Sequence, residues 1–505
     1  MWLGLWAERN DTPFGFRWPK DSVYSLGIHF TKEKRISDAL NFEKKLEDLQ
    51  KILNSWKRRK LTILGRINIA KSLGLSKLIY NASVLSLPEE FAKKVDKIVF
   101  DFVWEGKPHK IKKTTLIGDK DKGGLKMMEF DSMNKALKAS WVNRFKNDIS
   151  SPWKIIPDYM AHHLGGYRFL LSCTYKSKEL TLDNIPLFYL EVLKHWELIN
   201  KVMSNCDEDK VDISKIIIWN NTDVKIDGKP IFYRSWYQCG VEKVEHLLDD
   251  SGNNFRTYEN FIDRYTIKTN FTTYYGLLRA VRSKWKLSLL ATQKQTPRRN
   301  WFNIEENFSN AALHKIIVNY KFEPPSNETR IISYGIDPSE LSSIYKWPFT
   351  VTKNVKLAMF QFKINHNIIY TKDKLKKANL TSDDLCYLCK KERHTLEHML
   401  LRCSHAVKFW KEFYSWWLQI TKENITLPDR TLLYGPVQPG KHQLVLSSAL
   451  LIAKYFIYKC SLTEELLLFE LFKLQFYDHI KNRSSSTFNE KWQPFIVNNF
   501  IPLRQ

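Results

Sequence analysis

The sequence has no long uninterrupted run of apolar residues. Its longest, from Leu444 to Tyr458, contains Lys454 and is shorter than the roughly 20 apolar residues that a membrane-spanning helix needs. This stretch therefore predicts a buried helix. The first six residues, Met1 to Trp6, carry no basic stretch, and their apolar segment is too short for a secretion signal. Both absences predict a soluble, intracellular protein with no attachment to a membrane.

Cysteine is also scarce, with seven residues in a chain of 505. The odd number, the chain length and the lack of a secretion signal argue against a secreted scaffold held by disulfides. The cysteines are Cys173, Cys206, Cys239, Cys386, Cys389, Cys403 and Cys460. Aromatic residues, in contrast, are plentiful, with 30 Phe, 22 Tyr and 17 Trp. This composition, over this length, predicts a folded chain with about two or three hydrophobic cores.

Negative charge is in short supply in one part of the chain. The whole chain has a formal net charge of +25. Residues 1–50 carry eight basic and eight acidic side chains, whereas residues 51–150 carry 22 basic and 10 acidic side chains, a net of +12. Concentrated Lys and Arg favour a polyanionic partner, because they displace the counterions condensed on phosphates. The alternative is a solvated basic face that only aids solubility.

The first 150 residues change from a strand pattern to a helix pattern. Strands are expected at Trp2–Trp6 and Val23–Phe30. A chain that begins within an apolar strand suggests that the sequence starts inside a domain. From about residue 36 the pattern is that of an amphipathic helix. Its apolar stripe consists of Phe42, Leu46, Leu49, Leu53 and Trp56. Two further helices are expected after Thr62 and near Pro88.

Residues 151–345 alternate short aromatic segments with polar ones and show no assignable chemistry. A small hairpin is expected from the segments Ile216–Asn221 and Gly228–Tyr233. The polar stretches Gln293–Arg299 and Pro324–Thr329 are the best linker candidates. The expected fold class is mostly α with small β elements.

A compact Cys/His cluster follows. Cys386 and Cys389 form a Cys-x2-Cys pair; eight residues separate Cys389 from His398, and four residues separate His398 from Cys403. Two thiolates on one tight turn can reach a single ion, and a His and a Cys from the next segment complete a tetrahedral Cys3His set. Because four protein ligands leave no open position, the cluster predicts structural zinc and not catalysis.

Other histidines compete for the fourth ligand position. Four residues separate Cys389 from His394, as in retroviral knuckles, but the matching last ligand would then fall at Met399. His405 follows Cys403 too closely to be a comfortable partner. The remaining alternative is a set of unrelated buried cysteines. His398 is the preferred ligand.

Several segments together resemble the part of LINE-type (non-LTR) retrotransposon reverse transcriptases that follows the polymerase active site. The similarity covers nearly the whole chain, and the order and spacing of the segments make it specific. The matching segments are Leu26-Gly27-Ile28; Trp56 to Arg66, which resembles W-x-x-R-x-L-x-x-x-G-R, with Lys71 following; Phe100 to Lys107, which resembles F-x-W-x-G-K; Gly123-Gly124-Leu125 with Ala136, Trp141 and Arg144; Phe360-Gln361-Phe362 with His366; and the Cys/His cluster with Phe409-Trp410.

The resemblance implies a division into five segments. Palm-remnant strands are expected at 1–35, a basic, helical thumb-like domain at 36–150, and a mixed connector at 151–345. A zinc-binding domain of the reverse-transcriptase type is expected at 346–420, and a helical C-terminal segment at 421–505. The resemblance also implies that the protein is located in the nucleus, the cytoplasm or both.

The resemblance also implies contacts between the thumb-like domain and RNA or DNA. The candidate phosphate-binding residues are Arg58, Arg59, Arg66 and Lys71, and then the basic run Lys107, Lys110, Lys112 and Lys113. Such contacts give affinity without sequence reading. The basic run has the alternative reading of a mobile, solvated loop. Trp56 belongs to the apolar stripe and is expected in the core, not as a platform for a base.

The polymerase itself is not expected in this chain. Its metal-binding aspartates include a [FY]-x-D-D turn, and no such tetrapeptide occurs. The nearest carboxylate pairs, in Leu247–Asp250 and Thr381–Asp384, are expected in turns or helix caps. No catalytic residue is therefore assigned, and magnesium is expected only in the missing polymerase domain. The sequence predicts a nucleic-acid-binding fragment. The alternatives are a subunit that completes a polymerase supplied in trans, within a retroelement ribonucleoprotein, or a remnant that is non-functional or recruited as an interaction protein.

Overall fold

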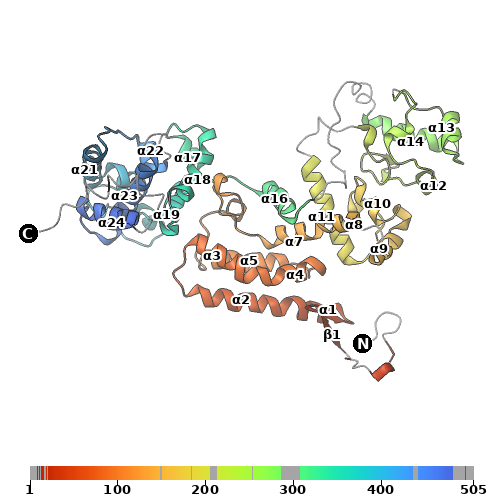
Figure 1. Ribbon diagram of the computed structural model, residues 1–505, viewed down its shortest axis with the longest axis horizontal. Helices are drawn as coiled ribbons and strands as arrows, with labels where there is room; N and C mark the ends of the chain where they lie inside the picture. The colour runs from red at the N-terminus through yellow and green to blue at the C-terminus, as the bar shows by residue number, and fades with distance from the viewer. Residues whose placement is uncertain are drawn as a thin grey trace, which may run out of the picture. The chain divides into compact units, whose positions relative to one another are not determined.

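The computed structural model describes residues 8–9, 11, 13–15, 19, 21–147, 151–182, 185–204, 213–252, 254–285, 308–435, 442–481 and 495. These residues are mostly helical, with four short strands (Figure 1). The expected fold class is therefore confirmed. The chain forms two compact units, and each draws on segments that are far apart in the sequence. Unit 1 comprises 1–55, 71–99 and 128–321; unit 2 comprises 56–70, 100–127 and 322–505. Residues 36–150, the predicted thumb-like segment, contribute to both.

A hairpin replaces the single strand expected at Val23–Phe30. Strands β1 (Ser22–Ser25) and β2 (Ile28–Thr31) pair antiparallel. The two residues between them, Leu26 and Gly27, have φ values of 50° and 80°. Two successive positive φ angles make the tight turn whose twist suits a two-residue hairpin. The prediction was wrong because a leucine gives no turn signal. The strand predicted at Trp2–Trp6 lies outside the described residues.

The helix expected from about residue 36 is present as three consecutive elements, α1 (Lys34–Asp38), a π-helical turn η3 (Ala39–Glu43) and α2 (Lys44–Lys57). Phe42, Leu49 and Leu53 of the predicted stripe are buried. Trp56, at the end of the stripe, is only partly buried, so its expected place in the core is not what the structure shows.

The described part of unit 1 includes two large hydrophobic cores. The first lies between α7 (Phe130–Ala139), α11 (Leu187–Ser204) and α16 (Asn310–Lys321), and α4 (Ser76–Val84) packs against α7. The second surrounds Trp219, Trp236 and Phe261. The other α-helices of unit 1 are α8 (Trp141–Asn147), α9 (Ile155–Met160), α10 (Tyr167–Ser172), α12 (Arg234–Gln238), α13 (Tyr258–Tyr265) and α14 (Phe271–Trp285); α5 (Phe91–Val103) begins here and ends in unit 2.

The hairpin expected in the middle region is present but shifted. It consists of β3 (Lys225–Ile226) and β4 (Lys229–Pro230), joined at Asp227 and Gly228. Of the predicted first segment, Ile217 instead forms an isolated bridge with Lys243. The Asp-Gly pair, both residues with positive φ, fixes the turn and therefore the register.

Unit 2 holds the Cys/His cluster and one large core. The core lies between α18 (Leu341–Val351), α19 (Val355–Asn365), α21 (Ser404–Thr421), α22 (Asp429–Tyr434), α23 (Gln443–Thr463) and α24 (Phe469–Lys481). The shorter α-helices are α3 (Ile63–Ile69), α6 (Lys113–Leu116), α17 (Glu328–Ile332) and α20 (Lys372–Lys377). Thr62 caps α3, since its Oγ1 accepts a hydrogen bond from Gly65 N at 3.1 Å.

One helix in the described part of the chain, α23, is long and apolar enough to cross a membrane by length and composition. In the structure, 78% of its apolar window is buried inside the protein. Helices α19 and α24 pack against it. This packing agrees with the buried helix predicted for Leu444–Tyr458.

Candidate metal centre and nucleic-acid interface

The four predicted zinc ligands come together in unit 2. The Sγ atoms of Cys386, Cys389 and Cys403 and one ring nitrogen of His398 all lie within 4.8 Å of one another. The first two cysteines sit on a tight turn, which Lys390 N closes by donating to Cys386 O at 3.0 Å. The φ of Lys390 is 55°, a left-handed conformation that reverses the chain directly after the Cys-x2-Cys pair.

The distances suit one tetrahedral ion. Cys386 Sγ and Cys403 Sγ are 3.9 Å apart, and Cys389 Sγ lies 3.3 Å from His398 Nε2. Tetrahedral zinc, with bonds of about 2.3 Å to sulfur and about 2.0–2.1 Å to nitrogen, requires separations of about 3.8 and 3.6 Å. The hydrogen bond from Cys386 Sγ to Cys403 Sγ lowers the pKa of the Cys403 thiol to about 7. A cation bound here would replace that shared proton.

Glu392 orients the histidine ligand. Its Oε2 lies 2.9 Å from His398 Nδ1, which leaves Nε2 facing Cys389. A carboxylate on the second ring nitrogen is the usual way in which proteins fix the tautomer of a metal-binding histidine. Sequence reasoning missed Glu392, although its position three residues after Cys389 was the available signal.

His394 is engaged elsewhere. It is fully buried, its Nδ1 accepts a hydrogen bond from Lys372 N at 2.9 Å, and its Nε2 lies 2.9 Å from Ser461 Oγ. Burial lowers the pKa of His394 to about 4, so the ring is neutral near pH 7. His394 therefore joins α20 to α23, and the cluster contains neither it nor His405.

The segment after the Cys-x2-Cys turn is anchored in the core of unit 2. The π-helical turn η13 (His398–Arg402) carries buried Met399 and Leu400 into that core. Just before it, Glu397 forms an ion pair with Arg330 and accepts a hydrogen bond from Tyr334 Oη at 2.9 Å. A metal ion at the cluster would therefore link the 386–390 turn to η13, which already packs into the core of unit 2.

The predicted phosphate-binding residues differ in accessibility. Arg58 and Arg59 are exposed, with the Arg59 guanidinium 4.2 Å from the centre of the Trp56 ring. Lys71, in unit 1, is exposed as well. Arg66 is buried, donates to Val103 O at 3.3 Å and pairs with Glu105. The Arg66 guanidinium therefore stabilises the fold through these contacts and is not available to a phosphate.

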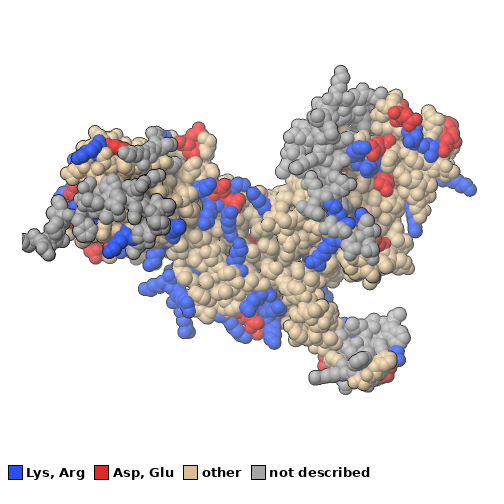
Figure 2. Space-filling view, in the orientation of Figure 1, with Lys and Arg blue, Asp and Glu red and all other residues tan. Residues whose placement is uncertain are grey.

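The basic run of unit 2 is partly neutralised. Lys107 pairs with Glu105 at 2.8 Å, and Lys112 pairs with Glu323 at 2.6 Å. Lys110 lies over the ring of Tyr370, with Nζ 3.5 Å from the ring centre. Lys113 is half-buried. On the face shown in Figure 2, Lys and Arg side chains are spread over several parts of the chain.

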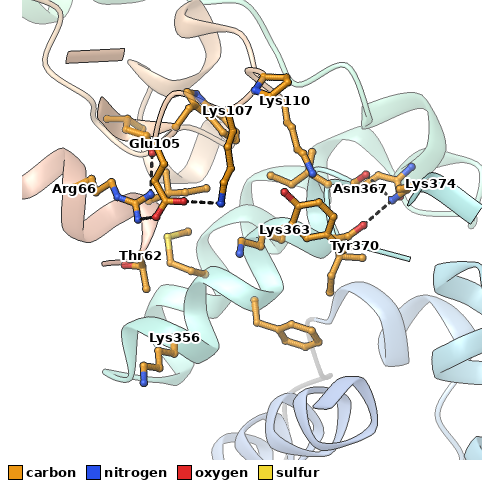
Figure 3. Close-up of a pocket in the computed structure, with 18 of the residues that line it drawn as sticks. Thr62, Arg66, Glu105, Lys107, Lys110, Lys356, Lys363, Asn367, Tyr370 and Lys374 are labelled. Carbon is orange, nitrogen blue, oxygen red and sulfur yellow. Dashed lines mark hydrogen bonds and ion pairs between the residues drawn. The ribbon is translucent and has the colours of Figure 1, made fainter. Parts of the chain in front are cut away.

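A pocket of about 1020 Å³ opens in unit 2 beside this run (Figure 3). We call it the basic pocket, because its described lining includes seven basic side chains and one acidic side chain, Glu105. The basic ones are Lys60, Arg66, Lys107, Lys110, Lys356, Lys363 and Lys374. Sequence reasoning found Arg66, Lys107 and Lys110 but missed Lys60. It also missed the last three, which follow the others by more than 200 residues in the chain.

The two carboxylate pairs singled out in the sequence lie in loops. Asp250 accepts hydrogen bonds from Arg256 at 2.7 Å and Arg264 at 3.2 Å. Asp383 pairs with Lys372, and Asp384 with Arg393. These carboxylates form local ion pairs, which were not predicted from the sequence.

Comparisons with known proteins give three matches. Residues 339–410 match the family described as zinc-binding in reverse transcriptase, and this range includes all four cluster residues. A putative ribonuclease H protein of Arabidopsis thaliana is 23% identical over 75% of this chain and 56% of its own length. The Transposon TX1 uncharacterized 149 kDa protein of Xenopus laevis is 22% identical over 46% of this chain.

The chain thus spans about half of the first relative, and the match to the second covers 18% of that protein. The family match places the Cys/His cluster inside a segment of the zinc-binding type, and the second relative is a transposon protein. Together these similarities support a retrotransposon-derived protein that carries the zinc-binding segment found in reverse transcriptases.

Proposed function

We propose that this chain is the nucleic-acid-binding part of a LINE-type retrotransposon reverse transcriptase, with a structural zinc ion at Cys386, Cys389, His398 and Cys403. The observation that carries the proposal is the Cys3His geometry within a segment that matches the zinc-binding family of reverse transcriptases. RNA and DNA are the proposed partners, together with the polymerase part of the same element. The proposed location is the nucleus or the cytoplasm.

The zinc ion would act on the fold and not on a substrate. All four coordination positions are filled by side chains, so no position is open to water or substrate. The ion would join the Cys386–Lys390 turn to His398 and to Cys403 at the start of α21. Folding free energy in such small sites comes largely from the metal.

Copying chemistry is assigned to the polymerase part. Two-metal phosphoryl transfer requires carboxylates that clamp both ions. Of the carboxylates considered from the sequence, Asp250 pairs with Arg256 and Arg264, Asp383 with Lys372 and Asp384 with Arg393. We therefore propose that this chain binds and positions nucleic acid.

Exposed Arg58 and Arg59, followed by exposed Lys60, supply the proposed contact with the phosphate backbone. Arginine binds phosphate through the N–H donors of its planar guanidinium group, and the guanidinium of Arg59 packs over the Trp56 ring. Because backbone phosphates carry no sequence information, this surface would bind RNA and DNA of any sequence.

The test measures affinity of the zinc-loaded chain for single-stranded RNA and for duplexes across a salt series. We expect log affinity to fall linearly with log salt. Exchange of Arg58 and Arg59 for Gln should reduce the slope by about two, one per lost phosphate contact. A matched variant with Lys268→Gln and Lys315→Gln, two exposed lysines of unit 1, removes the same charge and should keep the slope. Absence of binding at low salt would refute the proposed function.

A further inference from the structure

The basic pocket combines an aromatic floor with a charged rim. Phe360, in α19, packs its ring against Tyr455 and Tyr458 of α23, with ring centres 5.2 Å apart in each pair. All three residues line the pocket. Its volume of about 1020 Å³ lies at the upper end of the ~300–1,000 Å³ typical of ligand sites. An aromatic floor beneath a basic rim suits a ligand with a planar apolar part and a negative charge.

Tyr370 presents a ring on a fixed loop between α19 and α20. Tyr370 is 40% exposed, and Lys110 Nζ lies over one face of its ring, 3.5 Å from the ring centre. Lys374 Nζ holds the loop by donating to Asn367 O and Asn367 Oδ1, each at 2.7 Å, and to Ile369 O at 3.3 Å. A ring held in this way loses little conformational freedom when a ligand stacks on it.

The charge in the pocket is not balanced by its own lining. Glu105, the acidic residue there, is already paired with Arg66 and Lys107. Burial lowers the pKa of Lys363, and it lowers that of Lys374 to about 8. In Figure 3 the side chains of Lys107, Lys110, Lys363 and Tyr370 lie around the same space. A bound anion would stabilise these partly desolvated cations.

We infer that the basic pocket takes a nucleotide, with its base on the Tyr370 ring and its phosphate on Lys363. This inference rests on the proposed function and adds to it one specific binding site for a nucleotide, the basic pocket. The nucleotide comes either from an unpaired position of a single strand or from the free pool, because both present a base and a phosphate. A paired base is held in its duplex, so the pocket discriminates in favour of single strands.

The experiment uses the zinc-loaded full chain, labelled oligoadenylate as the single strand, an RNA duplex, and adenosine monophosphate as the free nucleotide. Tyr370→Ala should weaken oligoadenylate binding about tenfold, because the base loses the ring on which it stacks. Lys363→Gln should weaken it by about the same factor, because the charge-assisted hydrogen bond to the phosphate is lost. The duplex affinity should stay unchanged. Tyr370→Phe keeps the ring and should keep the affinity.

Matched controls are available outside the pocket lining. Lys353→Gln removes an exposed lysine just before α19, and Tyr320→Ala removes a tyrosine of α16 that is 54% exposed. Neither should change oligoadenylate binding. Comparable thermal midpoints would show that all variants are folded.

The outcomes separate the inference from the function on which it rests. Strong binding of oligoadenylate that is insensitive to Tyr370→Ala and Lys363→Gln would overturn the pocket and leave the proposed function standing. No binding of any RNA by the unaltered chain would overturn the proposed function. In that case, binding of adenosine monophosphate that is lost in Tyr370→Ala would still establish a site for a free nucleotide. No binding of either ligand would overturn both.

Discussion

Individual side chains in this protein often have a role different from the one that their type suggests. Arg66 is basic and belongs to a sequence pattern associated with nucleic-acid binding, yet it is buried against Glu105 and Val103 O. His394 has the spacing of a metal ligand, yet both of its ring nitrogens are used between Lys372 and Ser461. A buried polar group must satisfy its hydrogen-bonding capacity, and the nearest partners decide its role.

Lys454 is the clearest case of a charged group placed in a core. It is fully buried in α23, where Nζ donates to Gln361 Oε1 at 2.6 Å and to Leu433 O at 3.0 Å. Desolvation lowers its pKa from the ordinary 10.5 to about 7. The unfolded chain therefore binds this proton more tightly than the folded chain does between pH 7 and 10.5.

The sign of the pH effect follows directly. Below pH 7 the cost of the buried charge is present in full, and it disappears as the pH rises from 7 to 10.5. In Lys454→Met, the stability relative to the parent should be highest at pH 7 and fall on the way to pH 10, by an amount on the order of a few kcal/mol. Denaturant unfolding at several pH values measures the difference. Lys408→Met, at a side chain that is 81% exposed in α21, should give a profile parallel to the parent; a parallel profile for Lys454→Met would contradict the assignment.

At the scale of elements, close backbone approaches decide where short segments can lie. Gly118 and Gly124 belong to a tight loop of unit 2 in which Lys126 N donates to Gly118 O at 2.9 Å. A Cβ added at Gly124 would lie 2.0 Å from Gly118 O. The Gly123-Gly124-Leu125 motif is therefore explained by packing, because only glycine permits this approach.

Gly124→Ala should destabilise unit 2 by about 2–3 kcal/mol, since the backbone of the loop must shift to admit the methyl group. Gly65→Ala is the matched control. It lies in α3, where an added Cβ meets Thr62 Oγ1 at an ordinary 3.4 Å. Alanine there should raise helix stability by about 0.5–1 kcal/mol. Thermal unfolding of the two variants decides the question, and equal losses for both would contradict the packing explanation.

At the scale of the whole molecule, we expect unit 1 and unit 2 to differ in how their thermal stability responds to metal removal. The Cys/His cluster and the large core around α21 and α23 lie in unit 2, whereas the cores around Trp196 and Trp236 lie in unit 1. A chelator should therefore lower the thermal stability of unit 2 and leave that of unit 1 unchanged.

Cys389→Ser tests the same point without a chelator. We expect it to abolish stoichiometric zinc, as measured by metal analysis, and to increase protease cleavage within residues 386–413. Cys239→Ser changes an exposed cysteine of unit 1 and should keep one zinc per chain. Full zinc occupancy in Cys389→Ser would refute the ligand set.

The proposed nucleic-acid site could be predicted only in part. Charge density pointed to residues 51–150, and from that range Arg58 and Arg59 are exposed as expected. The pocket also needs Lys356, Lys363, Tyr370 and Lys374, which come from α19, α20 and the loop between them. A sequence pattern cannot show that residues some 250 positions apart lie together in space, because the distance between their side chains depends on the tertiary fold.

The sequence by itself determined what depends on short spacing. The Cys-x2-Cys turn, His398 and Cys403 lie within one short segment, so their spacing was enough to predict the four side chains that the structure brings together. The apolar stripe around Leu49 and Leu53 was enough to predict a helix. The tertiary structure decided what depends on burial and long-range packing. It made Leu26 and Gly27 a hairpin turn, placed Arg66 against Glu105, and assembled the basic pocket. Local geometry is fixed by neighbouring residues, whereas burial depends on every segment that packs around a side chain.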